Sequence, residues 1–282
     1  MNLDKGFKFN QSNLQDYIDC QLRYKLKYID RLAWPAVGSE PFIENAGYLE
    51  RGARFHKLVY QYLLGIPAGR LDAGIDDPEL RKWWGNFLSS IGKSVGDIEK
   101  CSVPFYPEII LNGVVDRYLL IAKFDLILIT DDQKIIIYDW KTYRNRPKRN
   151  WLLKRMQTRF YRYLFAKAGS HLVGGNDVLP EMLEMVYWFA NFPNQPERFD
   201  YDNVQFAEDQ IYINNLISEI SRLNEDEFAK TQDIKKCMFC VYRSFCDRGK
   251  SAGDIFNLLD PHEQDDDIGL TFDYEQVGEI EF

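Results

Sequence analysis

Long apolar segments are absent from this sequence of 282 residues. No run approaches the roughly 18 consecutive apolar residues that a membrane-spanning helix requires, which excludes a membrane protein. An apolar stretch is also missing from residues 1–10, so we expect no signal peptide. Together these absences predict a cytoplasmic protein whose five cysteines are reduced and do not form a disulfide framework.

Charge of one sign is missing from two further segments. Residues 141–167 contain ten Lys and Arg but no Asp or Glu, within a chain whose net charge is −8. Residues 251–282 contain ten Asp and Glu but no Lys or Arg. A solvated helix face and a solubilising tail are one interpretation. Ten unbalanced cations repel one another, however, and a polyanion relieves this repulsion, which favours a phosphate backbone as partner. We expect the acidic tail to be disordered or loosely docked.

The periodicity of apolar residues changes along the chain and predicts both helices and strands. Helical spacing is found at residues 11–30, 50–64, 80–91, 151–167 and 207–223. Short β-rich runs are found at residues 103–111, 114–121, 124–130, 135–140 and 182–190. Turn residues separate consecutive runs at Asn112 and Gly113 and at Asp131 and Asp132, so hairpins are expected. This order of elements predicts a mixed α/β fold in which helices flank a central sheet.

Charged residues interrupt two of the apolar β-rich runs. Asp139 and Lys141 end one run and lie two positions apart, so they share a face of the strand, while Trp140 points to the other. A hairpin can bring Asp125 of the preceding run close to Asp139. Two convergent carboxylates suit a hard divalent cation such as Mg²⁺, and a neighbouring Lys can orient or deprotonate a water molecule. A structural salt bridge between Asp139 and Lys141 is the alternative.

Three of the five cysteines follow the spacing C-x2-C-x5-C, at Cys237, Cys240 and Cys246. Cys20 stands near the N-terminus, and Cys101 lies in the predicted sheet region. Close spacing in a reducing compartment points to metal binding rather than a disulfide. Four thiolates suit zinc and an iron–sulfur cluster equally well, so spacing does not choose between them. Inert core cysteines are the remaining alternative.

Four motifs follow one another in a defined order: Gly52 to His56, Asp125, Asp139 to Lys141, and Gln157 to Tyr161. This arrangement resembles the PD-(D/E)XK nuclease superfamily and, within it, the RecB-like branch. The resemblance implies a restriction-endonuclease-like fold with a central mixed sheet flanked by helices. One departure is Ala122, three residues before Asp125, where the family often has Gly.

The resemblance also implies roles for these residues. His56, Asp125 and Asp139, with the carbonyl of Trp140, would bind Mg²⁺ or Mn²⁺. Lys141 would position the attacking water, and Gln157 and Tyr161 would face the active site from one side of a helix. Glu108 is a further candidate for an outer-shell carboxylate.

The cysteines resemble a subset of RecB-like nucleases that have one Cys upstream of the nuclease core and three downstream. This subset includes the nuclease domain of AddB and exonucleases associated with CRISPR adaptation. The resemblance implies a [4Fe–4S] cluster on Cys20, Cys237, Cys240 and Cys246 that joins the N- and C-terminal flanks of the domain. Gln21 replaces the Pro that often follows the first Cys. Cys101 falls outside the pattern and is expected to be a core residue.

The preferred interpretation is therefore a PD-(D/E)XK nuclease domain over residues 1–250, followed by the acidic tail 251–282. It would be a metal-dependent DNA nuclease, preferentially an exonuclease, in DNA repair, recombination or CRISPR adaptation. Single-stranded DNA or DNA ends would bind along residues 141–167. A helicase or CRISPR-adaptation partner would be a separate chain. The alternatives are a non-catalytic nucleic-acid-binding module and a zinc-stabilised interaction protein on the same fold.

Overall fold

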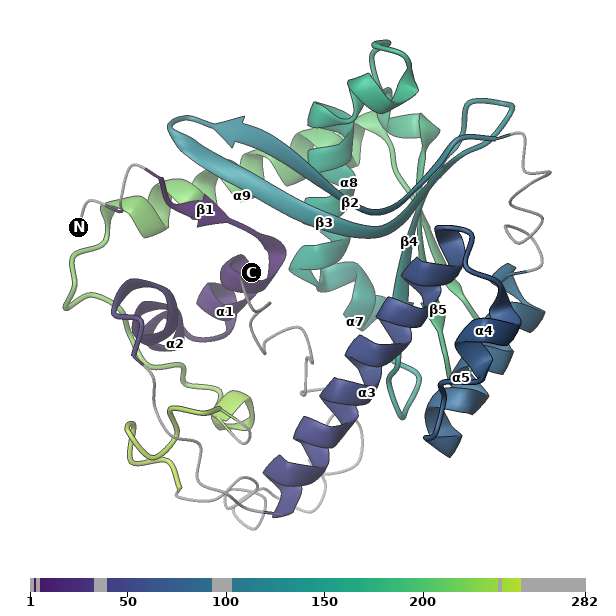
Figure 1. The fold of residues 1–282 in the computed structure, drawn as a ribbon. Helices are drawn as coiled ribbons and strands as arrows, with labels where there is room; N and C mark the ends of the chain where they lie inside the picture. The colour runs from purple at the N-terminus through teal and green to yellow at the C-terminus, as the bar shows by residue number, and fades with distance from the viewer. Residues whose placement is uncertain (1–2, 4–5, 33–39, 93–102, 238–239, 250–282) are drawn as a thin grey trace. The chain divides into compact units, whose positions relative to one another are not determined.

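The structure, a computed structural model, describes residues 3, 6–32, 40–92, 103–237 and 240–249 (Figure 1). The chain divides into two compact units. We call Glu50–Asn214 the sheet unit, and Met1–Leu49 together with Asn215–Phe282 the terminal unit. The predicted tail 251–282 and Cys101 lie outside the described residues. Within the described part of the chain, none of the helices is both long and apolar enough to cross a membrane.

The sheet unit contributes five strands to a mixed sheet, in the order β2–β3–β4–β5–β6. Its strands are β2 Phe105–Val115, β3 Tyr118–Ile129, β4 Ile135–Lys141, β5 Leu183–Phe189 and β6 Glu197–Asp200. Neighbouring strands are antiparallel except for the parallel pair β4 and β5. The antiparallel arrangement of β2, β3 and β4 follows from their short connections, since only a longer crossover permits a parallel pair.

Helices pack on both sides of β4 and confirm the predicted α/β architecture (Figure 1). The helices are α3 Glu40–Leu63, α4 Ala68–Asp72, α5 Pro78–Ser89, α7 Arg149–Lys154, α8 Met156–Ala168 and α9 Asn203–Arg222, with short 3₁₀ turns η2 Ser170–Val173 and η3 Pro180–Met182. On one side, Phe87 of α5 contacts Trp140 at a centroid distance of 5.5 Å, and Phe55 of α3 stacks on Trp188 at 6.0 Å. On the other side, Gln157 of α8 bonds Asp139. The side chain of Asp139 therefore points to the α8 side of β4.

The expected turn at Asn112 and Gly113 is wrong. Both residues lie inside β2, and the hairpin turns at Asp116, whose φ is 52°. Gly113 has a packing role instead, because a Cβ at this position would approach Leu164 of α8 to 2.6 Å. The run expected at 114–121 is therefore divided between two strands. The expected turn at Asp131 and Asp132 is confirmed.

Two predicted helices are interrupted. The helix expected over 151–167 begins at Arg149 and breaks at Arg155, whose extended backbone (φ −67°, ψ 143°) separates α7 from α8. The helix expected over 11–30 breaks at Cys20, whose backbone is also extended (φ −163°, ψ 109°). Periodicity did not reveal either break because the apolar positions continue in phase across it.

The terminal unit is built from short elements at both ends of the chain. They are β1 Lys8–Phe9, α1 Gln11–Asp19, α2 Gln21–Tyr24, the π-helical turn η1 Lys25–Ile29 and the 3₁₀ turn η4 Ile234–Cys237. Asn10 begins α1 with a capping box, in which its side chain accepts the N–H of Asn13 and the Asn13 side chain accepts the N–H of Asn10. Tyr24 stacks on Phe228 at a centroid distance of 6.3 Å, so the two ends of the chain share a core.

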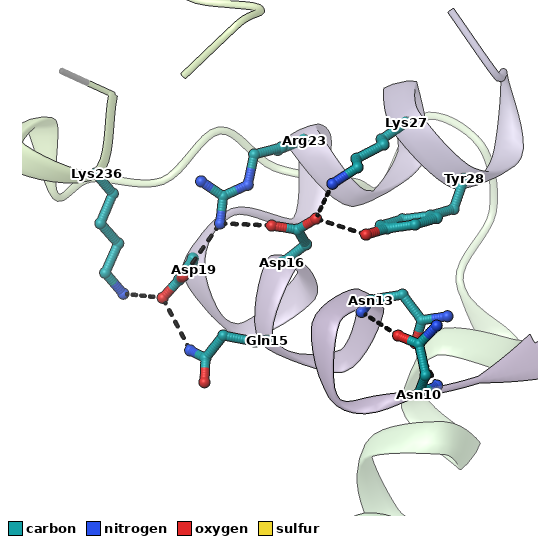
Figure 2. A network of polar contacts seen from close by, with 9 residues as sticks. All are labelled: Asn10, Asn13, Gln15, Asp16, Asp19, Arg23, Lys27, Tyr28 and Lys236. Atoms are coloured by element: carbon teal, nitrogen blue, oxygen red, sulfur yellow. Dashed lines mark hydrogen bonds and ion pairs between the residues drawn. The ribbon is translucent and has the colours of Figure 1, made fainter. Parts of the chain in front are cut away.

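A buried carboxylate organises the polar interior of this unit (Figure 2). Asp16 is fully buried, forms an ion pair with Arg23 at 2.9 Å, and accepts hydrogen bonds from Lys27 at 3.0 Å and the Tyr28 hydroxyl at 2.8 Å. Arg23 also bonds Asp19 at 3.0 Å. Because each partner comes from the same unit, the network ties α1, α2 and η1 together without an external ligand.

Candidate active site

Three carboxylates occupy one row across three neighbouring strands of the sheet unit. Glu108 of β2 lies between two residues whose partners flank Asp125, since Pro107 pairs with Leu126 and Ile109 with Phe124. Asp125 and Asp139 lie one residue beyond the pair formed by Leu126 and Tyr138. The antiparallel registers therefore bring Glu108, Asp125 and Asp139 to the same level of the sheet, as the sequence predicted for the last two.

His56 joins this row from helix α3. Its Nδ1 lies 3.2 Å from Oδ1 of Asp125. Ligand atoms of His56, Glu108 and Asp125 all lie within 4.8 Å of one another, and this is the only such set of three His, Cys, Asp or Glu residues in the described part of the chain. Gly52 lies one turn before His56, and a Cβ there would stand 3.2 Å from Oγ1 of Thr142. The glycine thus lets α3 approach the end of β4.

The charged residues of the site shift one another's pKa values. Burial acts to lower the pKa of His56, but the charge and hydrogen bond of Asp125, with Glu108 and Asp139, outweigh it and raise this pKa to about 9. Burial acts against ionisation of Asp125, yet His56, the Trp140 N–H and Lys141 hold the pKa of this carboxyl below its usual value. Burial and the charge of Asp125 raise the pKa of Glu108.

Asp139 and Lys141 form a buried pair at the end of β4. Lys141 Nζ lies 3.0 Å from Oδ2 of Asp139, and both side chains are at most 6% exposed. Gln157 of α8 donates to Oδ1 of Asp139 at 2.7 Å, which places the predicted helix residue against the predicted carboxylate. The salt bridge considered from the sequence is therefore present, and it lies beside Asp125 rather than apart from it.

Two further predicted residues take positions that the sequence did not specify. The backbone N–H of Trp140 donates to Oδ2 of Asp125 at 2.7 Å, so this residue orients a carboxylate, while its carbonyl stays a predicted ligand. Tyr161 is buried and packs on Phe124 at a centroid distance of 4.8 Å. This contact supports β3 from α8, on the strand face opposite to the one toward which Asp125 points.

Each carboxylate of the row contacts a cation of the protein itself. His56 contacts Asp125 and Lys141 contacts Asp139, as described above. Glu108 forms an ion pair with Lys123 of β3, a residue to which the sequence drew no attention. The signal available in the sequence was its position two residues before Asp125, which places both on one face of β3.

The basic segment 141–167 is balanced in space by acids from later in the chain. Arg146 and Arg149 both pair with Glu197 of β6, the latter at 2.8 Å. Arg159 lies 3.4 Å from Asp209 of α9. The expectation of ten unbalanced cations is therefore wrong for these members, because their partners lie outside the segment.

One further cation of this segment is buried and therefore cannot contact a DNA phosphate. Arg162 is 2% exposed and donates at 2.8 Å to the carbonyl of Asp200. In contrast, Arg144, Lys148 and Lys154 are exposed. Only part of the segment is thus available to a phosphate backbone.

The terminal unit brings its cysteines into one neighbourhood. Cys20, Cys237, Cys240 and Cys246 are not in disulfides. Burial raises the pKa of the Cys240 thiol to about 11, and the nearby Cys237 and Cys20 add to this shift. Burial also raises the pKa of Cys246, again with smaller contributions from Cys20 and Cys237. Arg248 donates to Sγ of Cys237 at 3.0 Å. The cysteines thus lie near one another although they come from opposite ends of the chain.

Comparison with known protein families gives a match over most of the chain. The family described as the PD-(D/E)XK nuclease superfamily matches residues 8–247, and the chain therefore belongs to it. The crystal structure of SSO0001 is similar at 14% identity with a TM-score of 0.38, covering 87% of each chain. A protein from Eubacterium rectale, provisionally assigned as an exonuclease, is similar at 12% identity with a TM-score of 0.47, covering 78% of this chain and 81% of its own. A search of curated proteins finds no match.

Nucleases of this superfamily use divalent metal ions, and the donor set of the site fits one. Carboxylate oxygens are the ligands that Mg²⁺ and Mn²⁺ prefer, and an imidazole nitrogen is also suited to Mn²⁺. The raised pKa of His56 indicates a strongly negative environment, which a bound cation would relieve.

Proposed function

We propose that the chain is a metal-dependent DNA nuclease that hydrolyses phosphodiester bonds at the row formed by Glu108, Asp125 and Asp139. The observation that carries this proposal is the convergence of His56, Glu108 and Asp125 within 4.8 Å, beside the buried pair of Asp139 and Lys141. A non-catalytic nucleic-acid-binding protein would have no need of this arrangement, because backbone phosphates are bound by cations and hydrogen-bond donors, not by converging carboxylates.

His56 and Asp125 would hold the metal, with Asp139 and the Trp140 carbonyl as further ligands. A bound divalent ion supplies Lewis acidity at the phosphate and makes a water molecule more acidic. Gln157 fixes Oδ1 of Asp139, so that carboxylate presents a defined face to the site. Lys141 is buried beside it and positions the attacking water through its ammonium protons. Its charge acts strongly there because little solvent screens it.

The substrate would approach over the exposed part of the basic segment. Arg144 follows the catalytic Lys141 by three residues, and Lys148 and Lys154 are exposed beyond it. The guanidinium of Arg155 lies 4.8 Å from the ring of Trp151, a pair on which an unpaired base can stack. These residues would contact the phosphate backbone and stack on bases without distinguishing one sequence from another. Such binding suits an exonuclease that acts on single strands or DNA ends in repair, recombination or CRISPR adaptation. A helicase or CRISPR-adaptation protein would be a separate partner.

End-labelled single-stranded and double-stranded DNA, together with a closed circular single strand, test this function. The linear substrates should be digested with Mg²⁺ or Mn²⁺ and not with EDTA. The circle distinguishes exonuclease from endonuclease action, because only an endonuclease opens it. Binding of DNA without cleavage under every metal condition would contradict the proposal and favour the non-catalytic module.

The terminal unit would hold a [4Fe–4S] cluster on Cys20, Cys237, Cys240 and Cys246. The proximity of Cys20 to the three later cysteines supports this proposal. Four thiolates also suit a tetrahedral zinc site, so metal analysis decides between the two cofactors.

Metal analysis of anaerobically purified protein tests the cofactor. About four irons per chain and broad visible absorbance are expected for a [4Fe–4S] cluster. The Cys246→Ala variant should lose this absorbance and melt at a lower temperature, because metal binding adds to folding free energy. Cys101→Ala is the control and should retain both properties. One zinc and no iron would overturn the cluster and leave the nuclease site unaffected.

A further inference from the structure

We propose that Glu108 is a metal ligand of the active site and that Lys123 is an internal competitor, which occupies this carboxylate until a divalent ion displaces it. The inference deepens the proposed function and rests on it. It concerns two residues that lie outside the motifs found in the sequence, and it predicts that their substitution changes metal affinity in opposite directions.

Glu108 faces the metal row from a distorted part of β2. Its side chain is 14% exposed, and its carboxylate lies within 4.8 Å of the ligand atoms of His56 and Asp125. Its φ is 51°, whereas the neighbouring Pro107 and Ile109 keep regular pairing with β3. A non-glycine residue in this left-handed region is uncommon within a strand. The carboxylate therefore joins the donors of the site, not the outer surface of the hairpin.

Lys123 differs from the other lysine of the site in its exposure to solvent. Its side chain is 43% exposed while it pairs with Glu108. Lys141 is 6% exposed, pairs with Asp139 and lies 5.7 Å from the ring centre of Tyr187. A buried ammonium that leaves such partners finds no water to replace them, whereas solvent already reaches Lys123 and can replace Glu108. Displacement by a metal is thus open to Lys123 and closed to Lys141.

The competition has a thermodynamic consequence. A metal that needs Glu108 binds only the fraction of molecules in which Lys123 has released it, so its apparent affinity is reduced by that fraction. Removal of Lys123 should raise the affinity, and removal of the Glu108 charge should lower it. A merely structural ion pair predicts a loss of stability in both variants and no change in metal affinity.

The test is a titration of the purified full-length chain with Mn²⁺ in the absence of DNA, with free Mn²⁺ measured by electron paramagnetic resonance. Glu108→Gln should weaken binding by about tenfold or more, the scale on which groups around a metal act. Lys123→Gln should tighten it. Lys134→Gln is the matched control, because Lys134 is 39% exposed and pairs with the buried Glu184 at 3.2 Å away from the metal row. This control should bind Mn²⁺ as the wild type does.

A double variant separates displacement from the general effect of removing a nearby positive charge. If Lys123 acts through Glu108, the gain from Lys123→Gln disappears in the Glu108→Gln background. A gain of equal size in both backgrounds would overturn the competition. Should Glu108→Gln fold poorly in thermal melts with EDTA, Glu108→Asp keeps the charge, shortens the side chain and should also weaken binding.

Asp125→Asn distinguishes failure of this inference from failure of the proposed function. Loss of Mn²⁺ binding in Asp125→Asn with wild-type affinity in Glu108→Gln would leave the nuclease site in place and remove Glu108 from it. Unchanged affinity in both variants would contradict the metal site itself.

Discussion

Two regions of the molecule bury carboxylates beside cations, and they do so in opposite ways. In the terminal unit, Asp16 is surrounded by Arg23, Lys27 and the Tyr28 hydroxyl (Figure 2). In the sheet unit, the ligand atoms of three residues converge within 4.8 Å of one another. Both regions contain buried carboxylates in ion pairs, so neither burial nor ion pairing distinguishes a catalytic site. The distinguishing feature is that several ligand atoms converge on one point, because a metal cation can bind there.

Local chain geometry explains the contrast. The partners of Asp16 come from 7 to 12 positions along the same short helical segment, so the network forms as that segment folds. The carboxylates of the site come from three strands and are joined by His56 from a helix that is 69 positions before Asp125. A convergent site thus depends on the register of the whole sheet, whereas the Asp16 network depends on one helical segment.

The largest expected effect is a loss of DNA cleavage, which we expect only from substitutions in the sheet unit. Asp139→Asn should reduce cleavage by about ten-thousandfold, the scale on which a catalytic group acts. Asparagine is the informative substitution because alanine would leave Lys141, 6% exposed, without its partner and would confuse activity with folding. End-labelled DNA and saturating Mg²⁺ provide the measurement, and circular dichroism checks the fold. Wild-type cleavage by this variant would remove Asp139 from the site.

The next effect should appear in stability alone. Asp16→Ala should destabilise the chain by about 3–5 kcal/mol, because it leaves a buried guanidinium at Arg23 without one carboxylate. Asp30→Asn is the control, since Asp30 is 33% exposed in its pair with Lys25, and exposed pairs contribute about 0–1 kcal/mol. Urea unfolding measures both. Equal small losses in the two variants would show that the Asp16 network contributes little.

A third prediction compares how the regions respond to metal. Mn²⁺ at about 100 times its dissociation constant should stabilise the folded chain by about 2.7 kcal/mol, by mass action. This gain should vanish in Asp125→Asn and persist in Asp16→Ala, whose network has no position for an added cation. Thermal melts with and without EDTA measure the difference. A gain that survives in Asp125→Asn would place the ion elsewhere.

The sequence predicted the convergent site better than it predicted the elements that support it. Alternation along β4 placed Asp139 and Lys141 on one face, and the turn at 131–132 correctly joined their strand to that of Asp125. Gly113 was misread, because a glycine required by the close approach of Leu164 has the same local appearance as a turn glycine.

The acidic partners of the basic segment 141–167 could not be predicted from the neighbouring sequence. Glu197 lies 48 positions after Arg149, beyond any window in which charges are counted along a sequence. The pairing emerges only when β6 joins the sheet. The backbone of Glu108 could not be predicted for a similar reason, because a single carboxylate beside a proline gives no sign of the left-handed conformation that it adopts in the folded hairpin.

The smallest expected effect is on the salt dependence of DNA binding, and it compares exposed cations of residues 141–167 with a cation that is paired within the protein. The logarithm of DNA affinity should fall with the logarithm of salt concentration, by about 0.7 to 0.9 for each neutralised phosphate. Arg144→Gln and Lys154→Gln should each reduce this slope, because both residues are exposed. Arg159→Gln should leave it unchanged, since Arg159 pairs with Asp209 at 3.4 Å and its guanidinium lies 4.7 Å from the ring centre of Tyr212.

The slope is a better measurement than affinity here. Substitution of Arg159 can weaken binding indirectly by releasing Asp209, a carboxylate that is 5% exposed, and added negative charge repels DNA at every salt concentration. Only a residue that displaces counterions from phosphate changes the number released, and that number sets the slope. A reduced slope in Arg159→Gln with unchanged slopes in the other two variants would move the DNA path from the exposed cations to the face of α8 that contacts α9.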